Sequence, residues 1–318
     1  MRGNSNAEYR MQNAELRKIH EEGVCEESKM RETGEAFAKI NISLDIVSKM
    51  DDGYHNMLMV MQSIGLSDEI TVECAPGEGI SVETGLPYVP GDERNIAAKA
   101  ALAFFAHTGI KGMKTSIGIR KNIPVCAGLG GGSADGACVL RMMDKMFGTG
   151  LTRNELETLG NSIGSDVPFC ITGGTALAEG RGDALTDLKQ MPACHIVLCK
   201  PPFSFSTPEL FSLINCEKIR ARPDTAGIVD AIEKGDLNGV ARRMYNVFED
   251  VLPRGKRDIE DIKYALLDNG ALGAILTGTG SAVFGVYDKA ADAENAYETL
   301  RTSYEDCFLC ETTGAVGI

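Results

Sequence analysis

The chain has 318 residues, which is enough for one large domain or two ordinary domains with a buried core. Its formal net charge of −13 argues against binding to nucleic acid or to an anionic membrane surface, because both require a broad basic face. No stretch of sequence approaches the roughly 18 apolar residues of a membrane span. We therefore expect a cytoplasmic protein with a small-molecule partner and with neither nucleic acid nor membrane as a partner.

The ten cysteines predict no disulfide framework, because most of them sit among apolar residues, as reduced core cysteines do. Cys307 and Cys310 have the spacing of a metal or redox pair, but no second pair and no nearby His accompany them. We interpret them as two residues of a strand and predict no metal site built by protein ligands.

Residues 1–33 are rich in Glu, Arg, Lys and Asn and contain too few aliphatic residues for an independently stable helix. We expect them to form a mobile N-terminal extension. Two domains are predicted to follow, at residues 34–184 and 185–318, because the composition changes after Gly180-Arg-Gly182.

A strand is predicted from Phe37, because apolar and polar residues alternate strictly from there, with Ile40 and Ile42 on one face. Lys39 and Asn41 share the opposite face. They belong either to a site or to an ordinary solvated strand surface, and the pattern alone does not separate these readings.

The Asp52-Gly53 turn comes next and would present Tyr54 and His55 at the end of a hairpin. A single histidine in such a place is more often an ordinary surface or core residue than a site residue. The following segments are predicted as a strand at 69–73, a Gly- and Pro-rich loop at 75–92, a helix at about 94–106 and a strand at 115–120.

A glycine-rich loop follows that strand and is the feature hardest to explain by packing. Its glycines are Gly128, Gly130, Gly131 and Gly132. Because a helical pattern begins after them with Ser133 as its expected N-cap, the loop amides and the helix dipole would suit phosphate. The P-loop, dinucleotide and protein-kinase patterns all fail here. The alternative is a glycine-rich surface loop.

A further helix is predicted from Thr152, which forms a capping box with Glu155, to about Ile163. Asp166 lies just beyond it, and Pro168 is expected to hold the preceding residue extended. Asp166 could be a simple loop carboxylate or a base placed where a substrate hydroxyl arrives.

The second domain is predicted to alternate strands and helices, which suggests an α/β or α+β fold. We expect strands at 195–200, 282–287 and 306–311, helices at about 225–234, 257–269 and 290–303, a Pro-rich turn at 201–208 and a second glycine stretch at 276–281.

Several of these segments match motifs of one known family, in the family's order. They are Ala38-Lys-Ile-Asn41, Asp52-Gly-Tyr-His55, Gly128-Leu-Gly-Gly-Gly-Ser133, Gly164-Ser-Asp-Val-Pro-Phe169, Ala178-Glu-Gly180 and Thr277-Gly-Thr-Gly280. Together they resemble the GHMP kinase superfamily, named for galacto-, homoserine, mevalonate and phosphomevalonate kinases. Asp52-Gly-Tyr-His55 is most similar to the branch whose substrate is 4-diphosphocytidyl-2-C-methyl-D-erythritol.

The resemblance implies an α/β (α+β) fold with an N-terminal ribosomal-protein-S5-like α/β domain and a ferredoxin-like C-terminal domain. The sequence leaves open whether the protein is a monomer or a homodimer. It implies ATP-dependent phosphorylation of the substrate's 2-hydroxyl in non-mevalonate isoprenoid precursor synthesis, with Mg²⁺ offsetting charge on the triphosphate. Asp166 would be the general base and Lys39 its neighbouring cation. ATP would be bound by Pro124, Gly128, Leu129, Gly130, Gly131, Gly132 and Ser133. The substrate would be bound by Asn41, Tyr54, His55, Thr207 and Phe211.

The chain departs from the family pattern in two places. Ala134 and Gly136 stand where the family usually has Ser and Ala, which removes a hydroxyl and places a glycine inside a helix at a cost of about 1 kcal/mol. We expect weaker contact with ATP or metal at most. Lys49-Met-Asp51 replaces a common Arg-Pro, which affects the rigidity of the turn.

Two other functions remain open from the sequence. One is a mevalonate, homoserine or sugar kinase of the same superfamily, which would lack the residues that hold cytosine. The other is a catalytically silent nucleotide-binding relative on the same fold. The Asp-Gly-Tyr-His motif argues against the first, and the presence of both Lys39 and Asp166 argues against the second.

Overall fold

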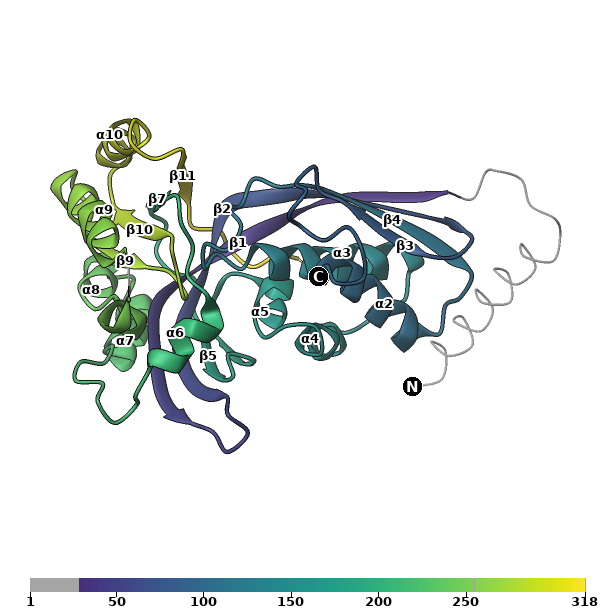
Figure 1. The fold of residues 1–318 in the computed structure, drawn as a ribbon, viewed down its shortest axis with the longest axis horizontal. Helices are drawn as coiled ribbons and strands as arrows, with labels where there is room; N and C mark the ends of the chain where they lie inside the picture. Colours follow the sequence, from purple (N-terminus) through teal and green to yellow (C-terminus); the bar gives the residue numbers. More distant parts are fainter. Residues whose placement is uncertain (1–28, 254, 318) are drawn as a thin grey trace.

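The molecule is built around a long antiparallel hairpin. In the computed structural model, which describes residues 29–253 and 255–317, β1 (Met30–Lys49) pairs along its whole length with β2 (His55–Pro76). The turn between the strands uses Gly53, whose φ of +89° lies in the left-handed region that favours glycine. The hairpin runs through both halves of the molecule (Figure 1).

β1 differs from the predicted strand in its length and its surroundings. It begins at Met30 rather than Phe37. Its polar face is covered as well as its apolar face, so that Lys39 and Asn41 are only 4% and 0% exposed. The reading of these two residues as an ordinary solvated strand surface is therefore wrong, because the glycine-rich loop at Gly130 and the carboxylate of Asp166 lie against that face.

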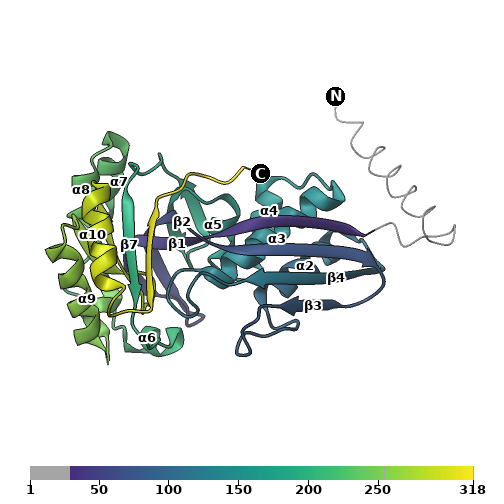
Figure 2. The same ribbon diagram turned by 90° about the horizontal axis from the view of Figure 1, so that it is seen from above.

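The first sheet has the strand order β3-β4-β2-β1-β8, with β5 paired to the first part of β2 and β6 paired to β5. The bounds of these strands are β3 (Ile80–Glu83), β4 (Met113–Arg120), β5 (Thr175–Gly180), β6 (Ala184–Asp187) and β8 (Tyr245–Asn246). One face of this sheet is covered by α2 (Ile96–Thr108), α3 (Gly131–Phe147), α4 (Arg153–Asn161) and α5 (Val167–Thr172), as Figures 1 and 2 show.

The second sheet is antiparallel throughout, in the order β11-β7-β10-β9. Its strands are β7 (His195–Lys200), β9 (Gly273–Leu276), β10 (Val283–Tyr287) and β11 (Asp306–Glu311). The accompanying helices are α6 (Thr207–Leu213), α7 (Thr225–Lys234), α8 (Leu237–Ala241), the 3-10 helix η1 (Val247–Val251), α9 (Lys256–Asp268) and α10 (Ala290–Leu300). This succession of strands and helices is the expected ferredoxin-like arrangement.

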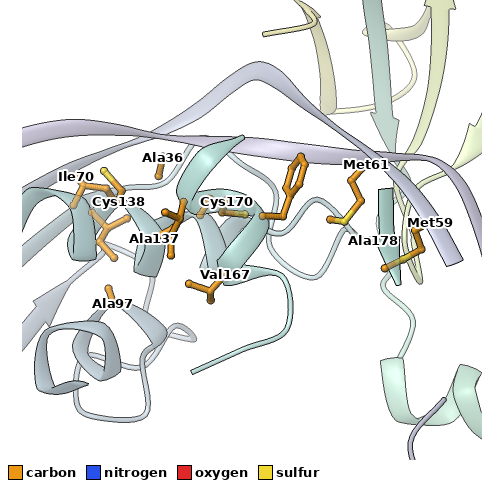
Figure 3. Close-up of a cluster of buried hydrophobic side chains, with 14 of the residues drawn as sticks. Ala36, Met59, Met61, Ile70, Ala97, Ala137, Cys138, Val167, Cys170 and Ala178 are labelled. Carbon is orange, nitrogen blue, oxygen red and sulfur yellow. The ribbon is translucent and has the colours of Figure 1, made fainter. Parts of the chain in front are cut away.

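The core beneath the hairpin fixes the two helices that carry the candidate site. Ala137 and Cys138 of α3 lie beside Val167 and Cys170 of α5, facing the underside of β1 and β2 (Figure 3). Gly136 of α3 has a packing reason, because a Cβ there would lie 2.7 Å from Cγ2 of Ile96. The helix-interior glycine noted in the sequence therefore lets α3 approach the start of α2.

Several local predictions were wrong. The N-cap of α3 is Gly130, with a φ of +68°, so Ser133 lies inside the helix. Val167 is not extended but is the first residue of α5, because a proline in the first turn needs no backbone N–H partner. The turn predicted at 201–208 ends in α6, which begins at Thr207.

The predicted domain limits need two comments. Residues 1–28 of the expected extension lie outside the described residues, whereas Met30 to Thr33 pair with Cys74 to Thr71 as the start of the hairpin. β6 crosses the boundary expected at residue 185. No helix among the described residues combines the length and apolar character that a bilayer crossing requires.

The end of the chain returns to the first sheet. The backbone N–H of Thr313 donates to the carbonyl of Ser63 (2.9 Å), and that of Val316 donates to the carbonyl of Thr172 (2.7 Å). An isolated bridge also joins Gly173 to Ala315. Residues that follow β11 of the second sheet therefore hold the C-terminal end of α5.

Candidate active site

A cleft of about 1140 Å³ lies between the two halves of the molecule and gathers most of the predicted site residues. The predicted residues that line it are Lys39, Asn41, Tyr54, His55, Gly128, Gly130, Asp166, Thr207 and Phe211. Pro124, Leu129, Gly131, Gly132 and Ser133 are not among its lining residues, although they belong to the same loop and helix start. Residues of the first sheet, of the two glycine stretches and of α6 thus meet around one space.

A lysine and an aspartate form the charged centre of this cleft. Nζ of Lys39 lies 3.4 Å from Oδ2 of Asp166 and donates a hydrogen bond to Oδ1 of Asn41 (2.8 Å). The lysine side chain is 5% exposed and the aspartate side chain 30% exposed. Because a buried ammonium group requires polar partners, Asn41 and Asp166 together hold Lys39 at the cleft wall. The more exposed carboxylate faces the space where a substrate would enter.

Two glycine stretches meet beside this pair. The backbone N–H of Asn41 donates to Oγ1 of Thr277 (3.1 Å), and the Thr277 hydroxyl donates to the carbonyl of Gly128 (3.4 Å). A Cβ on Gly128 would lie only 2.1 Å from the Thr277 carbonyl oxygen, and Gly128 has a φ of +79°. Only glycine fits this position. Asn246 holds the second stretch by donating to the carbonyls of Leu276 (2.9 Å) and Gly278 (2.8 Å).

The start of α3 can still bind an anion, although its N-cap is not the predicted residue. None of the described side chains caps this helix, whose N-cap is Gly130. The N–H groups of the first helical turn therefore remain without a capping side chain, and the positive end of the helix dipole adds to them. Leu129 is buried and contributes its carbonyl to the backbone N–H of Lys39 (3.0 Å).

A buried charge cluster supports the loop, and the sequence reasoning missed it. Nζ of Lys121 lies 2.5 Å from Oδ2 of Asp68 and 2.9 Å from Oδ2 of Asp135. Oδ1 of Asp68 also accepts from the backbone N–H groups of Asn122 (2.6 Å) and Ile123 (2.8 Å). The cluster therefore connects β2, the strand exit before the glycine loop, and α3.

The second oxygen of Asp135 is unusual. Oδ1 is buried and has no hydrogen-bond partner among the described residues. Burial is the main cause that raises the pKa of Asp135 to about 7, and the nearby Asp68 carboxylate acts in the same direction, whereas Lys121 opposes it. No local signal in the sequence could reveal this cluster, because its members are 53 and 14 residues apart.

The other end of the cleft is aromatic. The rings of His55 and Phe211 lie with centroids 5.1 Å apart, and Phe248 meets Phe211 edge-on at 5.0 Å. Burial, followed by the charge of Lys49, lowers the pKa of His55, so its imidazole is neutral at physiological pH. Thr207 reaches this region through a hydroxyl contact with Thr279 at 2.9 Å.

Tyr54 is arranged differently from the other predicted aromatic residues. It is 58% exposed, and the guanidinium carbon of Arg181 lies 4.1 Å above its ring centroid. Arg181 also lines the cleft and forms an ion pair with Asp52. The sequence analysis assigned no role to Arg181 or Phe248, although the Ala178-Glu-Gly180 motif lies next to Arg181.

The residues that line the cleft fit a nucleoside triphosphate with a bound magnesium ion. No group of three or more His, Cys, Asp or Glu side chains in the described part of the chain could hold a metal by itself. Mg²⁺, however, is usually bound through one or two carboxylates together with substrate phosphates. Asp166 provides a carboxylate in this cleft, and Gly128 and Gly130 of the loop that would hold the phosphates line the same space.

Comparison with known proteins gives a consistent picture. Residues 95–174 match the model of the GHMP kinases N terminal domain, and residues 228–306 match that of the GHMP kinases C terminal domain. A protein of Clostridium botulinum (strain Alaska E43 / Type E3) named 4-diphosphocytidyl-2-C-methyl-D-erythritol kinase is 44% identical over 277 residues, covering 87% of this chain and 98% of that protein.

Two further relatives carry this name or an equivalent one. The protein of Caldicellulosiruptor saccharolyticus is 41% identical, covering 87% of this chain and 95% of its own length. A crystal structure titled 4-(cytidine 5'-diphospho)-2C-methyl-D-erythritol kinase superimposes with a TM-score of 0.76 at 27% identity, covering 89% of this chain and 100% of the solved one. The similarity therefore extends through both halves of the molecule.

Proposed function

The chain belongs to the 4-diphosphocytidyl-2-C-methyl-D-erythritol kinase family of GHMP kinases, and on that premise we propose which of its residues carry out the reaction. It is a small-molecule kinase that uses ATP to phosphorylate the 2-hydroxyl of 4-diphosphocytidyl-2-C-methyl-D-erythritol in isoprenoid precursor synthesis. The observation that carries the assignment of residues is the Lys39–Asp166 pair, which shares one cleft with the glycine loop and the aromatic end.

Asp166 is the general base. Its carboxylate takes the proton of the substrate's 2-hydroxyl while that oxygen attacks the γ-phosphorus, and the bond from the γ-phosphorus to the bridging oxygen breaks to release ADP. Lys39 lies 3.4 Å from the carboxylate and is too buried to leave this position easily. Its ammonium group stabilises negative charge that develops on the transferred phosphoryl group.

The glycine loop and the start of α3 bind the triphosphate. The backbone can approach the phosphates closely at Gly128 and Gly130, where φ is +79° and +68°. Gly131, Gly132 and Ser133 contribute first-turn N–H groups. Mg²⁺ bound to the phosphates would neutralise charge on the leaving group, and the glycine loop would hold it through those phosphates.

The aromatic end binds the cytidyl group. Phe211 is braced by Phe248 and offers a ring for stacking, and the neutral imidazole of His55 beside it can exchange hydrogen bonds with the polar edge of cytosine. Asn41 and Thr207 line the space between this end and the reacting centre.

All nine cysteines in the described residues are free thiols, which supports our proposal of a cytoplasmic enzyme.

A substrate panel tests the function. An ATPase-coupled assay on 4-diphosphocytidyl-2-C-methyl-D-erythritol, mevalonate, homoserine and galactose should give turnover with the first compound alone. Turnover with one of the other three would favour a different GHMP kinase, and no turnover with any of them would favour a silent relative. The His55→Ala and Phe211→Ala variants should lose affinity for the cytidyl substrate while they keep their affinity for ATP.

A further inference from the structure

We propose that the guanidinium group of Arg181 binds the diphosphate of the substrate, an inference that rests on the proposed function. The substrate joins its cytidine to the reacting polyol through two phosphates, so it brings negative charge into the middle of the cleft. The cleft lies in a chain with a net charge of −13 and itself contains the carboxylates of Asp166 and Asp183. A positive group is therefore needed where the diphosphate lies.

The cleft offers few such groups. Among its lining residues, all within the described part of the chain, the Lys and Arg side chains are those of Lys39 and Arg181. Lys39 is already committed to Asn41 and Asp166 at the reacting centre. Arg181 lies over the ring of Tyr54, whose neighbour in the chain, His55, belongs to the aromatic end that we assign to cytosine. A substrate that spans the cleft from the aromatic end to Asp166 would bring its diphosphate past Arg181.

The guanidinium group is oriented in advance. It forms an ion pair with Asp52, whose carboxylate also accepts the backbone N–H of Tyr54 (3.0 Å). The backbone N–H of Arg181 donates to Oδ1 of Asp183 (3.2 Å), and Asn161 donates to the other oxygen of that carboxylate (3.1 Å). Asp52 thus fixes the guanidinium group, and Asp183 fixes the backbone of Arg181. Because the residue is already ordered, less conformational entropy is lost when a ligand binds.

The group also retains binding capacity. A guanidinium carries five N–H donors, and within the described residues Asp52 is its one hydrogen-bonding partner. The side chain of Arg181 is 44% exposed. Phosphate oxygens suit the remaining donors, because arginine recognises phosphate through paired hydrogen bonds in a plane.

The position over Tyr54 has a second consequence. One face of the tyrosine ring is covered by the guanidinium group, so a cytosine base can stack only on the opposite face. Arg181 would then touch the diphosphate and support the ring that touches the base. The stack from Asp52 through Arg181 to Tyr54 is therefore suited to recognising a cytidine diphosphate as one unit.

Binding measurements separate these two contributions. We expect Arg181→Gln to weaken binding of CDP by roughly 10-fold or more, the scale of lost charge-assisted hydrogen bonds, and to weaken binding of cytidine much less. Calorimetry with CDP and with cytidine as the probes gives both values. In steady-state assays the KM for 4-diphosphocytidyl-2-C-methyl-D-erythritol should rise while the KM for ATP stays unchanged. Arg181→Lys keeps the charge and should recover part of the CDP affinity.

The matched control is Arg94→Gln. Arg94 also forms an ion pair with an aspartate, Asp92, but it is not among the residues that line the cleft, so CDP binding should stay normal. Equal losses for CDP and cytidine, or no loss for either, would overturn the diphosphate assignment. Failure of the wild-type enzyme to phosphorylate the cytidyl substrate would instead overturn the proposed function, and the two failures are therefore distinguishable.

Discussion

Asp166 is held in place by the backbone that follows it rather than by its own side chain. The next residue, Val167, and Cys170 one turn later lie in the core beneath the hairpin (Figure 3). The Asp166 side chain makes no capping hydrogen bond within the described residues, and its ion-pair partner is Lys39. A change at this side chain should therefore alter the chemistry without loosening the helix.

The variant Asp166→Asn tests this assignment. We expect kcat to fall by roughly 10²-fold or more, the usual scale for losing a general base, while ATP affinity stays normal. Calorimetric ATP titration and a coupled assay supply the two measurements. Asp230→Asn is the control, because Asp230 pairs with Lys234 on the surface of α7. Near-normal turnover in Asp166→Asn would show that another group takes the proton.

The raised pKa of Asp135 predicts that the stability of the fold depends on pH. Its pKa is raised from 3.8 to about 7 in the folded protein, mainly by burial, so the folded state binds this proton more tightly than the unfolded state. The favourable contribution of the protonated group is thus complete below about pH 4 and is lost as the pH rises through 7. Asp135→Asn keeps the shape but removes this ionisation. The stability of the variant relative to wild type should therefore be higher at pH 8 than at pH 5.

Urea unfolding of both proteins at the two pH values measures this difference. Asp144→Asn provides a comparison on the same helix, because Asp144 caps a turn through Thr149 and Leu151 and has no buried lysine partner among the described residues. It shows the effect of removing a carboxylate of α3 that lies outside the buried cluster. If the Asp135→Asn difference proved independent of pH, the carboxylate would be ionised throughout and Lys121 would balance it fully.

At the scale of elements, the two glycine stretches pack together as one wall, to which we assign phosphate binding. Gly128 packs on the carbonyl of Thr277, and a Cβ at Gly278 would lie 2.9 Å from the carbonyl of Gly128. Asn246 fixes the second stretch from behind. The backbone of the loop can therefore approach a ligand only while the second half of the molecule remains closely packed against it.

The variant Gly128→Ala tests this contact. The new Cβ would lie 2.1 Å from the Thr277 carbonyl oxygen, so the two loops must separate, and ATP affinity and thermal stability should both fall. Gly148→Ala is the matched control: Gly148 also has a positive φ (+57°), but no described atom outside its neighbourhood lies within 4 Å of its Cβ position. The control should lose about 1 kcal/mol of stability and keep its ATP affinity. Unchanged ATP affinity in a folded Gly128→Ala protein would contradict the shared wall.

The sequence predicted elements well where a local pattern decides them. The bounds of β7, α7 and β11 agree with those expected from periodicity and end signals. The motif residues Lys39, Asp166 and others were found through resemblance, and the structure brings them into one cleft. What could not be predicted depends on distant neighbours. The Arg181–Asp52 pair spans 129 residues, and no spacing rule reports such a contact.

The wrong local predictions have a similar cause. Pro168 was expected to keep Val167 extended, but the core contacts of α5 outweigh that preference and the proline fits the first helical turn. Ser133 is a suitable cap by composition, yet Gly130 adopts the positive φ that the loop geometry requires. In both places the local sequence allows two conformations, and contacts with the rest of the fold determine which one forms.

At the scale of the whole molecule, the hairpin and the end of the chain tie the two halves together around the cleft. β1 carries Lys39 and Asn41, and the hairpin turn places Tyr54 at the cleft edge. On the other side, residues after β11 bond to Ser63 of β2 and to Thr172 at the end of α5. Since Asp166 is the N-cap of α5, the chain end holds the same helix that positions the proposed base.

Removing residues 313–318 should therefore affect both stability and catalysis. The deletion removes the bonds Thr313 N–H to Ser63, Gln62 to the Thr313 carbonyl (2.8 Å) and Val316 N–H to Thr172, each worth about 1 kcal/mol. With its C-terminal end released, α5 should fluctuate, and kcat should fall more than the KM for ATP rises, because a small displacement of the base lowers the rate. Urea unfolding and steady-state kinetics measure the two effects.

A chain that ends after Val316 is the control, because it keeps each of these bonds and should behave like the full chain. The kinetic comparison must be made at a temperature where the shorter protein is fully folded, as judged by circular dichroism. If kcat per folded molecule then equals that of the control, the chain end only stabilises the fold. A lower kcat with normal ATP affinity would show that contacts from the second half of the molecule help to place Asp166 for catalysis.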